Sequence, residues 1–251
     1  MGACWTLTRR ELGAYFLSLT GYIIIAAALF LVGFNFVEMI QGLQQEPTTK
    51  PITEIFFSDS LVFWFILVLT TPVITMRLFA LEKFSGTFET LMTTPVSDLQ
   101  VVLAKFFAAM LFYILMWLPL LGCVFTVRHL TGDAAAFDFG NVGATFLGIL
   151  LIGSLFISLG CCASALTRSQ VAAAMMGLAL GATLFLLGYL ARALPVQTDW
   201  QTRTLACFAF FDQMRDFARG VVDTRPVVFF VSLTGFFLFL TLRIVESRRW
   251  K

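Results

Sequence analysis

Six long runs of apolar residues dominate the pattern of this sequence. They lie near residues 18–39, 60–79, 101–125, 141–166, 171–191 and 226–245, and each is close to the roughly 20 residues that a helix needs to cross a bilayer. The period-two alternation of a strand is not the pattern of these runs. The sequence therefore predicts an all-α, polytopic membrane protein with six transmembrane helices. No linker or change of composition divides the chain, so we expect one domain over residues 1–251.

Composition supports this prediction and excludes other classes. Hydrophobic residues make up 59% of the chain and charged residues 13%, which is too few charges to cover a soluble domain of this size. The same hydrophobicity excludes disorder. The five cysteines cannot all pair, so a disulfide scaffold is excluded. The net charge of +2 gives no electrostatic footprint for a nucleic acid.

The distribution of basic residues predicts the orientation. Arg9 and Arg10 precede the first run, which is too long for a signal peptide, so we expect it to be an uncleaved anchor. Ten of the 17 Lys and Arg residues fall on the side of the two termini and seven on the other side. The positive-inside rule then predicts a multi-pass protein with both termini in the cytoplasm.

The sequence predicts the first residues of two helices. Ser97 and Gln100 have the spacing of a capping box before the third run, in which each side chain satisfies a backbone donor near the other. Thr167 and Gln170 repeat that spacing before the fifth run. The turn between the fourth and fifth runs must then be tight, which makes these two helices antiparallel neighbours.

Residues for catalysis are missing from the sequence. The single histidine, His129, has no HExxH or CxxC motif with it, and no GxSxG or GxxxxGK[ST] motif occurs, so we predict no catalytic residue, no metal site and no bound cofactor in this chain. Arg77 and Lys105 fall at the ends of runs, where we expect their long side chains to snorkel into water. Because ion-coupled transporters usually carry charges at mid-membrane depth, any transport must draw its energy from a partner.

The polar segment between the second and third runs is the first candidate functional segment. Gly86 should break the helix that leaves the membrane, and a short helix can restart at Thr87 and reach Pro95. An apolar stripe of this helix would be formed by Phe88, Leu91 and Met92, while Glu82, Lys83 and Glu89 would stay in water. This helix could dock into a groove on a partner or lie on lipid.

Residues 5–17 form the second segment, which we expect to be an amphipathic helix in the plane of the membrane. Its lipid face would carry Leu7, Leu12, Tyr15 and Phe16. Its water face would carry Arg9, Arg10 and Glu11.

Residues 208–222 form the third segment, an expected helix at the outer surface before the sixth run. Its two faces and its end follow from helical spacing: Asp212, Arg215, Asp216 and Arg219 on the polar face, Phe211, Met214, Phe217, Ala218 and Val221 on the apolar face, and Gly220 at the end. It could be a simple lid on the bundle or an outer gate. Elsewhere, Pro72 should kink the second span, and Gly177 with Gly181 forms a GxxxG pattern for packing or for lining a pathway.

Five stretches carry a resemblance to a known family. They are Arg10-Glu11-Leu12-x-x-Tyr15-Phe16 with Gly21-Tyr22, the segment from Arg77 through Glu82-Lys83-x-x-Gly86-Thr87-x-Glu89-x-Leu91 to Pro95, Leu166-Thr167-x-x-Gln170-Val171, Phe217-x-Arg219-Gly220-Val221-Val222-Asp223, and Glu246-x-Arg248-Arg249-Trp250. In these stretches the chain resembles the membrane permeases of type-2 ABC exporters, which have the six-helix type V exporter fold, and in particular their gliding-motility branch. Thr90 stands where a Leu is more usual.

The resemblance implies roles that spacing does not show. Residues 82–94 would be the coupling segment that meets an ATPase, with Glu82, Lys83, Ser85, Gly86, Thr87, Phe88, Glu89, Leu91 and Met92 as its contact residues. Residues 5–17 would be the connecting helix, residues 208–222 would act at the outer gate, and spans two and five would line the pathway. The implied partners are an ABC ATPase subunit that binds ATP and Mg, a second permease copy or a paralogue, and an auxiliary subunit with a periplasmic domain.

Two other functions stay open at this stage. A lipid-modifying membrane enzyme would need carboxylates at one interface, for which Asp212 and Asp216 are the candidates. A membrane anchor that holds a complex without transporting anything is the second. The transported substrate cannot be read from the sequence.

Overall fold

The computed structural model describes residues 2–45, 51–58, 61–87, 96–131, 138–193 and 208–247, which form α-helices and turns with no strand among them. The helices are α1 (Gly2–Phe16), α2 (Leu19–Gln45), α3 (Ile52–Ser58), α4 (Val62–Thr75), α5 (Ala80–Ser85), α7 (Asp98–Trp117), α8 (Pro119–Thr131), α9 (Phe139–Leu166), α10 (Gln170–Ala193), α12 (Phe210–Ala218) and α13 (Thr224–Ser247).

Six helical stretches among the described residues are long and apolar enough to cross a membrane, which confirms the predicted all-α polytopic fold. They are α2, α4 continued by α5, α7 continued by α8, α9, α10 and α13. The third stretch extends from Asp98 to His129, several residues beyond the predicted run at both ends. Pro72 lies inside α4, which ends three residues later at Thr75.

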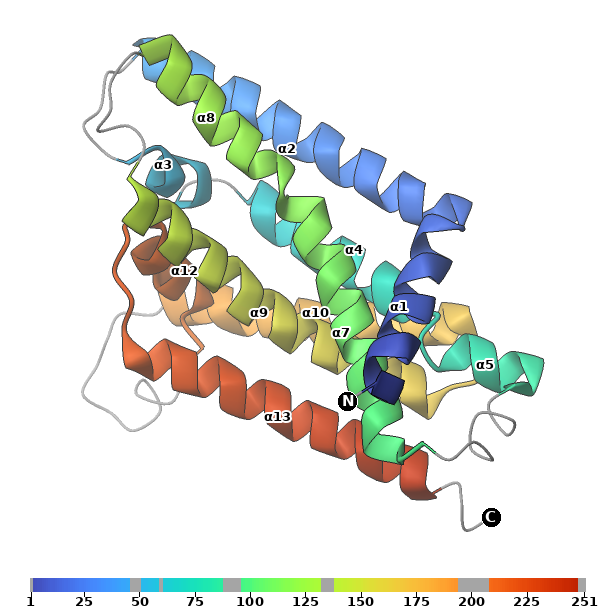
Figure 1. Cartoon of the computed structure of the whole chain (residues 1–251). Coiled ribbons are helices and arrows are strands. Elements are labelled where there is room, and N and C mark those ends of the chain that lie inside the picture. Colours follow the sequence, from blue (N-terminus) through green and yellow to red (C-terminus); the bar gives the residue numbers. More distant parts are fainter. Residues whose placement is uncertain are drawn as a thin grey trace, which may run out of the picture.

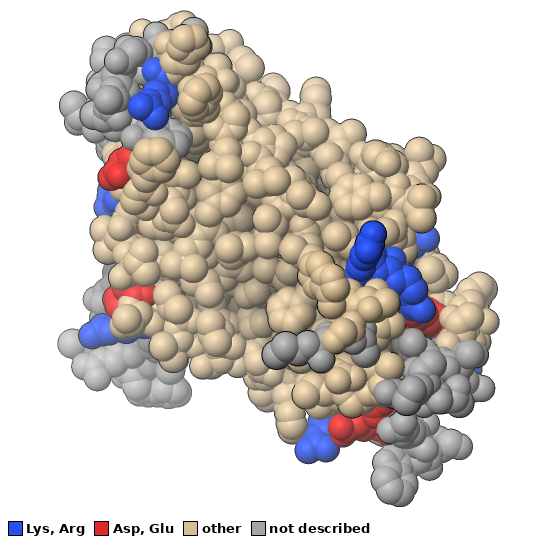
Figure 2. Space-filling model, viewed as in Figure 1, with Lys and Arg blue, Asp and Glu red and all other residues tan. Residues whose placement is uncertain are grey.

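The two ends of the bundle carry different short helices (Figure 1). At one end, on the right of the figure, α1 and α5 lie near the C-terminal end of α13, and at the opposite end α3 and α12 lie together. In Figure 2 the charged side chains gather near these two ends, with a broad band of uncharged atoms between them. This distribution is expected when the helices between the two ends face lipid.

Helix α9 is the centre of the bundle and contacts α4, α7, α10, α12 and α13. Close contact with two of these helices depends on glycines. A Cβ atom at Gly153 would overlap the ring of Tyr113 in α7, and one at Gly160 would overlap the side chain of Thr75 in α4. Small residues let helix backbones approach in this way where dispersion contacts drive association.

Helices α2, α10 and α13 lie at the periphery. Their exposed apolar side chains include Tyr22 and Phe30 on α2, Met175 on α10, and Val228 and Phe236 on α13. A surface with so many exposed apolar side chains is not stable in water, so lipid or another protein chain must cover it.

Of the two predicted capping boxes, one is confirmed and one is wrong. The Ser97 hydroxyl accepts from the Gln100 N–H, and the Gln100 side chain accepts from the Ser97 N–H, both at 3.3 Å. At the other position α9 ends at Leu166 and α10 begins at Gln170. Ser169, not Thr167, caps α10 by accepting from the Ala172 N–H at 3.5 Å. Residues 167–169 are needed to reverse the chain, so Thr167 cannot also begin a helix. The predicted contact between the antiparallel helices α9 and α10 is confirmed.

Candidate functional site

Four charged side chains meet where α1, α5 and α7 come together. We call Arg10, Glu11, Glu82 and Lys105 the charged cluster. Lys105 Nζ lies 2.8 Å from Glu82 Oε1 and 3.3 Å from Glu11 Oε1. Arg10 Nη2 lies 2.9 Å from Glu11 Oε1 and 3.5 Å from Glu82 Oε1. The cluster thus joins residues up to 95 positions apart in sequence, and its formal charges cancel.

Lys105 is the buried member of the cluster. Its side chain is 2% exposed, against 15% for Glu11 and 14% for Glu82. A desolvated ammonium is stable only when paired, and here two carboxylates and the ring of Phe79, whose centroid is 5.5 Å from Nζ, surround it. Lys105 therefore fixes α5 and α1 to the start of the third span.

Tyr15 makes a second link between α1 and the bundle. Its hydroxyl donates to the carbonyl oxygen of Ile74 at 2.8 Å, near the end of α4, and its ring stacks on Phe112 of α7 with centroids 4.8 Å apart. Burial raises the pKa of the Tyr15 phenol well above its ordinary value, because the charged form would lose its hydration. The neutral phenol is therefore a permanent donor at this junction.

Ser164 of α9 holds the turn between α4 and α5. Its hydroxyl accepts from the N–H groups of Phe79 and Ala80, each at 3.1 Å, and donates to the carbonyl of Met76 at 3.2 Å. Lys83 Nζ donates to the carbonyl oxygen of Ala165. The free N–H groups at the start of α5 are thereby satisfied by α9, and α5 is fixed from two sides.

Several expectations for these residues were wrong. Lys105 does not snorkel, Glu82 and Lys83 do not stay in water, and Tyr15 does not face lipid. Glu11 is largely covered instead of lying on a water face. The physical reason is that α1 packs on α7, so the face expected to lie on lipid enters the core. One signal could have indicated this: ionisable residues at membrane borders in a charge-poor chain are expected to pair.

The other predicted residues of α1 are less buried than Tyr15. Phe16 packs edge-on against Phe112 with centroids 5.8 Å apart. Arg9 and Arg10 are exposed, as expected for the water face. Helix α1 itself covers Gly2–Phe16, which includes nearly all of the predicted connecting helix.

The predicted coupling segment is only partly described. Gly86 ends α5 with φ of 73°, in the left-handed region, so the expected helix break is confirmed. Ser85 and Thr87 are exposed and share a hydrogen bond of 2.8 Å between their hydroxyls, and Phe84 is 78% exposed. Phe88, Glu89, Leu91 and Met92 lie outside the described residues, so the helix up to Pro95 stays a prediction.

At the opposite end, α12 has the predicted apolar face. Phe210, Phe211, Met214, Phe217 and Ala218 are buried. Val221, expected on the same face, is 56% exposed, because the helix ends at Ala218. Gly220, with φ of 84°, turns the chain in a Schellman motif in which the Val221 N–H donates to the Asp216 carbonyl at 2.9 Å.

The polar face of α12 does not form one site. Arg219 Nη2 lies 2.6 Å from Glu54 Oε1 of α3, and this hydrogen bond raises the pKa of the guanidinium. Thr53 donates to the Ala218 carbonyl at 2.7 Å. Asp212 and Arg215 are half-buried and Asp216 is exposed. Glu54 and Thr53, which lock α3 to α12, were not predicted, because the charge pattern of α3 alone gives no partner.

The glycines of α10 face inward. A Cβ atom at Gly177 would lie 3.4 Å from Pro72 of α4, and one at Gly181 would lie 3.4 Å from Phe156 of α9. Both glycines therefore serve packing within the chain.

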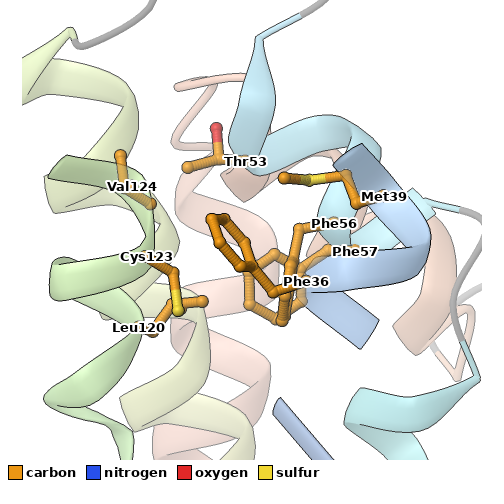
Figure 3. A pocket seen from close by; sticks show the side chains of 8 residues that line it. All are labelled: Phe36, Met39, Thr53, Phe56, Phe57, Leu120, Cys123 and Val124. Carbon is orange, nitrogen blue, oxygen red and sulfur yellow. The ribbon is translucent and has the colours of Figure 1, made fainter. Parts of the chain in front are cut away.

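A small apolar cavity lies between α2, α3 and α8, close to the α3–α12 lock (Figure 3). The side chains that line it are Phe36, Met39, Thr53, Phe56, Phe57, Leu120, Cys123 and Val124. No ionisable carboxyl or imidazole is among them. Over the described part of the chain, no group of three or more His, Cys, Asp or Glu residues is placed to hold a metal ion.

Comparison with known proteins agrees with this architecture. Residues 37–244 match the family described as ABC-2 family transporter protein. A search of curated proteins found no match. The family match covers most of the chain, including the second to fifth candidate spans, nearly all of the sixth, and the part of the charged cluster formed by Glu82 and Lys105. The chain therefore belongs to the ABC-2 transporter family, as the membrane-spanning permease subunit of an ABC transporter.

Proposed function

We propose that this chain is the permease of an ATP-driven exporter and that a separate ATPase drives it through residues 82–94. The observation that carries the proposal is the attachment of α5. The charged cluster fixes α5 to α1 and α7, and Ser164 with Lys83 fixes it to α9. A force applied at the exposed end of α5 would therefore reach the third and fourth spans.

The partner would bind at the end of α5. Phe84 is 78% exposed and precedes Gly86, so an aromatic side chain is available beside the predicted coupling helix. A short helix with an aromatic anchor suits a groove on a partner protein. In this proposal ATP and Mg bind to the partner, and both termini and the coupling segment are cytoplasmic, in a bacterial inner membrane.

The proposed transport unit contains two permeases. Helices α4 and α10 pack together through Pro72 and Gly177, and Phe65, Leu69 and Met175 of these helices are exposed. A second permease, identical or paralogous, would cover these side chains, and the pathway would run between the two copies. Closure of an ATPase dimer would then shift the population between inward-open and outward-open states. The gliding-motility branch would add a subunit with a periplasmic domain.

Helix α12 would act at the outer gate. It is locked to α3 by Arg219 and Glu54, and Phe217 packs against Gly148 of α9. Because α9 also holds α5 through Ser164, a movement of α9 would reach both ends of the bundle.

Co-purification with ATP hydrolysis as the readout tests this function. The tagged chain would be isolated from membranes of its own host, and ATP turnover of the eluate would be measured. Loss of a buried aromatic contact worth roughly 1.5–3 kcal/mol predicts that Phe84→Ala lowers the co-purified ATPase activity by about tenfold or more. Phe125→Ala, at a position 63% exposed in α8, is the matched control and should keep full activity. Equal activity in both variants would contradict docking at α5. Charge reversal at Glu82 is unsuitable, because it would disrupt the charged cluster itself.

A further inference from the structure

A cleft lies beside the charged cluster, between α1 and the region where α4 passes into α5. Its free space is about 60 Å³, which is room for a few water molecules or one small polar group. Its lining combines apolar side chains with two opposite charges: Glu11, Ala14, Tyr15, Arg77, Leu78 and Leu81.

Arg77 lies at the border with lipid. Its Nη1 donates to the Thr20 hydroxyl at 2.7 Å, and Thr20 stands at the start of α2, directly after two strongly exposed apolar residues. Leu17 is 91% exposed and Leu19 is 76% exposed, so this corner needs lipid around it. The bond to Thr20 uses one of the five N–H donors of the guanidinium, which leaves a fork that fits a phosphate group.

Glu11 supplies the opposite charge. Its Oε1 atom forms ion pairs with both Lys105 and Arg10. Its Oε2 atom has no ion pair or hydrogen bond with any described residue. A ligand that enters the cleft therefore meets one cation and one anion. A zwitterion with a primary ammonium can donate to the free carboxylate oxygen while its phosphate lies on Arg77, whereas a purely anionic headgroup has no cation to place there.

We propose that this cleft binds the phosphoethanolamine headgroup of a phospholipid in the leaflet that borders α1. The phosphate lies on the Arg77 guanidinium, the ammonium lies toward Glu11, and the acyl chains follow Leu17 and Leu19. The site does not depend on an ATPase partner, so it stands or falls separately from the proposed transport function.

Native mass spectrometry of the full chain in detergent tests this site. The purified protein would be titrated with dioleoyl phosphatidylethanolamine, dioleoyl phosphatidylcholine or dioleoyl phosphatidylglycerol, and with water-soluble glycerophosphoethanolamine. We expect one tightly bound phosphatidylethanolamine, with the other two lipids bound several-fold more weakly and no displacement by the soluble headgroup at equal concentration. Equal affinity for the three lipids, or displacement by the soluble headgroup, would overturn the proposal.

Variants locate the site. Charge-assisted hydrogen bonds of this kind are worth roughly a tenfold change in affinity or more, so Arg77→Gln should weaken phosphatidylethanolamine binding by about that factor, and Arg77→Lys should recover most of it. The matched control is Arg243→Gln, because Arg243 is an exposed arginine of α13 that pairs with Glu246, and its loss should leave binding unchanged. Undiminished binding in Arg77→Gln, or the same loss in Arg243→Gln, would place the lipid elsewhere.

Discussion

Replacing Lys105 by methionine tests the charged cluster most severely. Lys105→Met keeps the length of the side chain but removes the ammonium, so Arg10 is the cation that the carboxylates of Glu11 and Glu82 keep among the described residues. Removing one partner of a buried ion pair costs roughly 3–5 kcal/mol. Both carboxylates retain some exposure, 15% and 14%, and Arg10 stays 2.9 Å from Glu11. We therefore expect a loss near the lower limit, about 3 kcal/mol.

Two further variants separate the loss of the pair from general damage. The triple variant Lys105→Met, Glu11→Gln, Glu82→Gln removes all the buried charge and should recover most of the lost stability, because neutral replacements of buried ion networks are often tolerated. Arg243→Met breaks an exposed pair with Glu246 and should cost less than about 1 kcal/mol.

The assay is equilibrium unfolding in mixed micelles, followed by the fluorescence of the five tryptophans. Transport-linked ATP turnover, measured on the same preparations, should fall with Lys105→Met beyond what lost folded protein explains. Wild-type stability in Lys105→Met would refute the electrostatic reasoning. So would a triple variant as unstable as the single one.

Two other substitutions test the packing. Gly160→Ala would push a methyl group into Thr75, so the free energy of unfolding should fall by roughly 1–3 kcal/mol. Gly143→Ala in the same helix has open space around it, so the free energy of unfolding should stay the same or rise by up to about 1 kcal/mol. Equal effects of the two substitutions would contradict the close contact of α9 with α4. Tyr15→Phe removes the bond to Ile74 and should cost about 1 kcal/mol near pH 7. Because the pKa of Tyr15 is raised by folding, its contribution is complete below about pH 10 and is lost as the pH rises further, so unfolding of the wild type should depend more steeply on alkaline pH than that of Tyr15→Phe.

Local signals were readable from the sequence, and long-range pairings were not. The Ser97–Gln100 capping box and the helix break at Gly86 depend on residues within a few positions of each other, and both are confirmed. The Thr167 box was wrong because its spacing says nothing about the length of the turn before α10. A short motif identifies the start of a helix only when the preceding helix leaves room for it.

The charged cluster was missed for a different reason. Its members are 23 to 95 positions apart, except for the neighbours Arg10 and Glu11, and amphipathic periodicity assigned each to water or lipid separately. Packing of α1 on α7 decided their environment. The Glu54–Arg219 lock of α3 to α12 was missed likewise, since its partners are 165 positions apart. A rule that the few charged residues of an apolar chain pair with one another would have predicted both contacts better than amphipathic periodicity did.

Site-specific photo-crosslinking at position 84 tests the central claim most directly. A photoreactive amino acid would replace Phe84 in living cells, and position 125 in α8, also exposed, would serve as the control. The account predicts a crosslink from position 84, and not from position 125, to a subunit that binds and hydrolyses ATP. A Phe84→Cys variant tests the opposite outcome. If a membrane-impermeant thiol reagent added outside intact cells labels this variant more than the unchanged chain, the account is contradicted, because the end of α5 would then lie away from the cell's ATP.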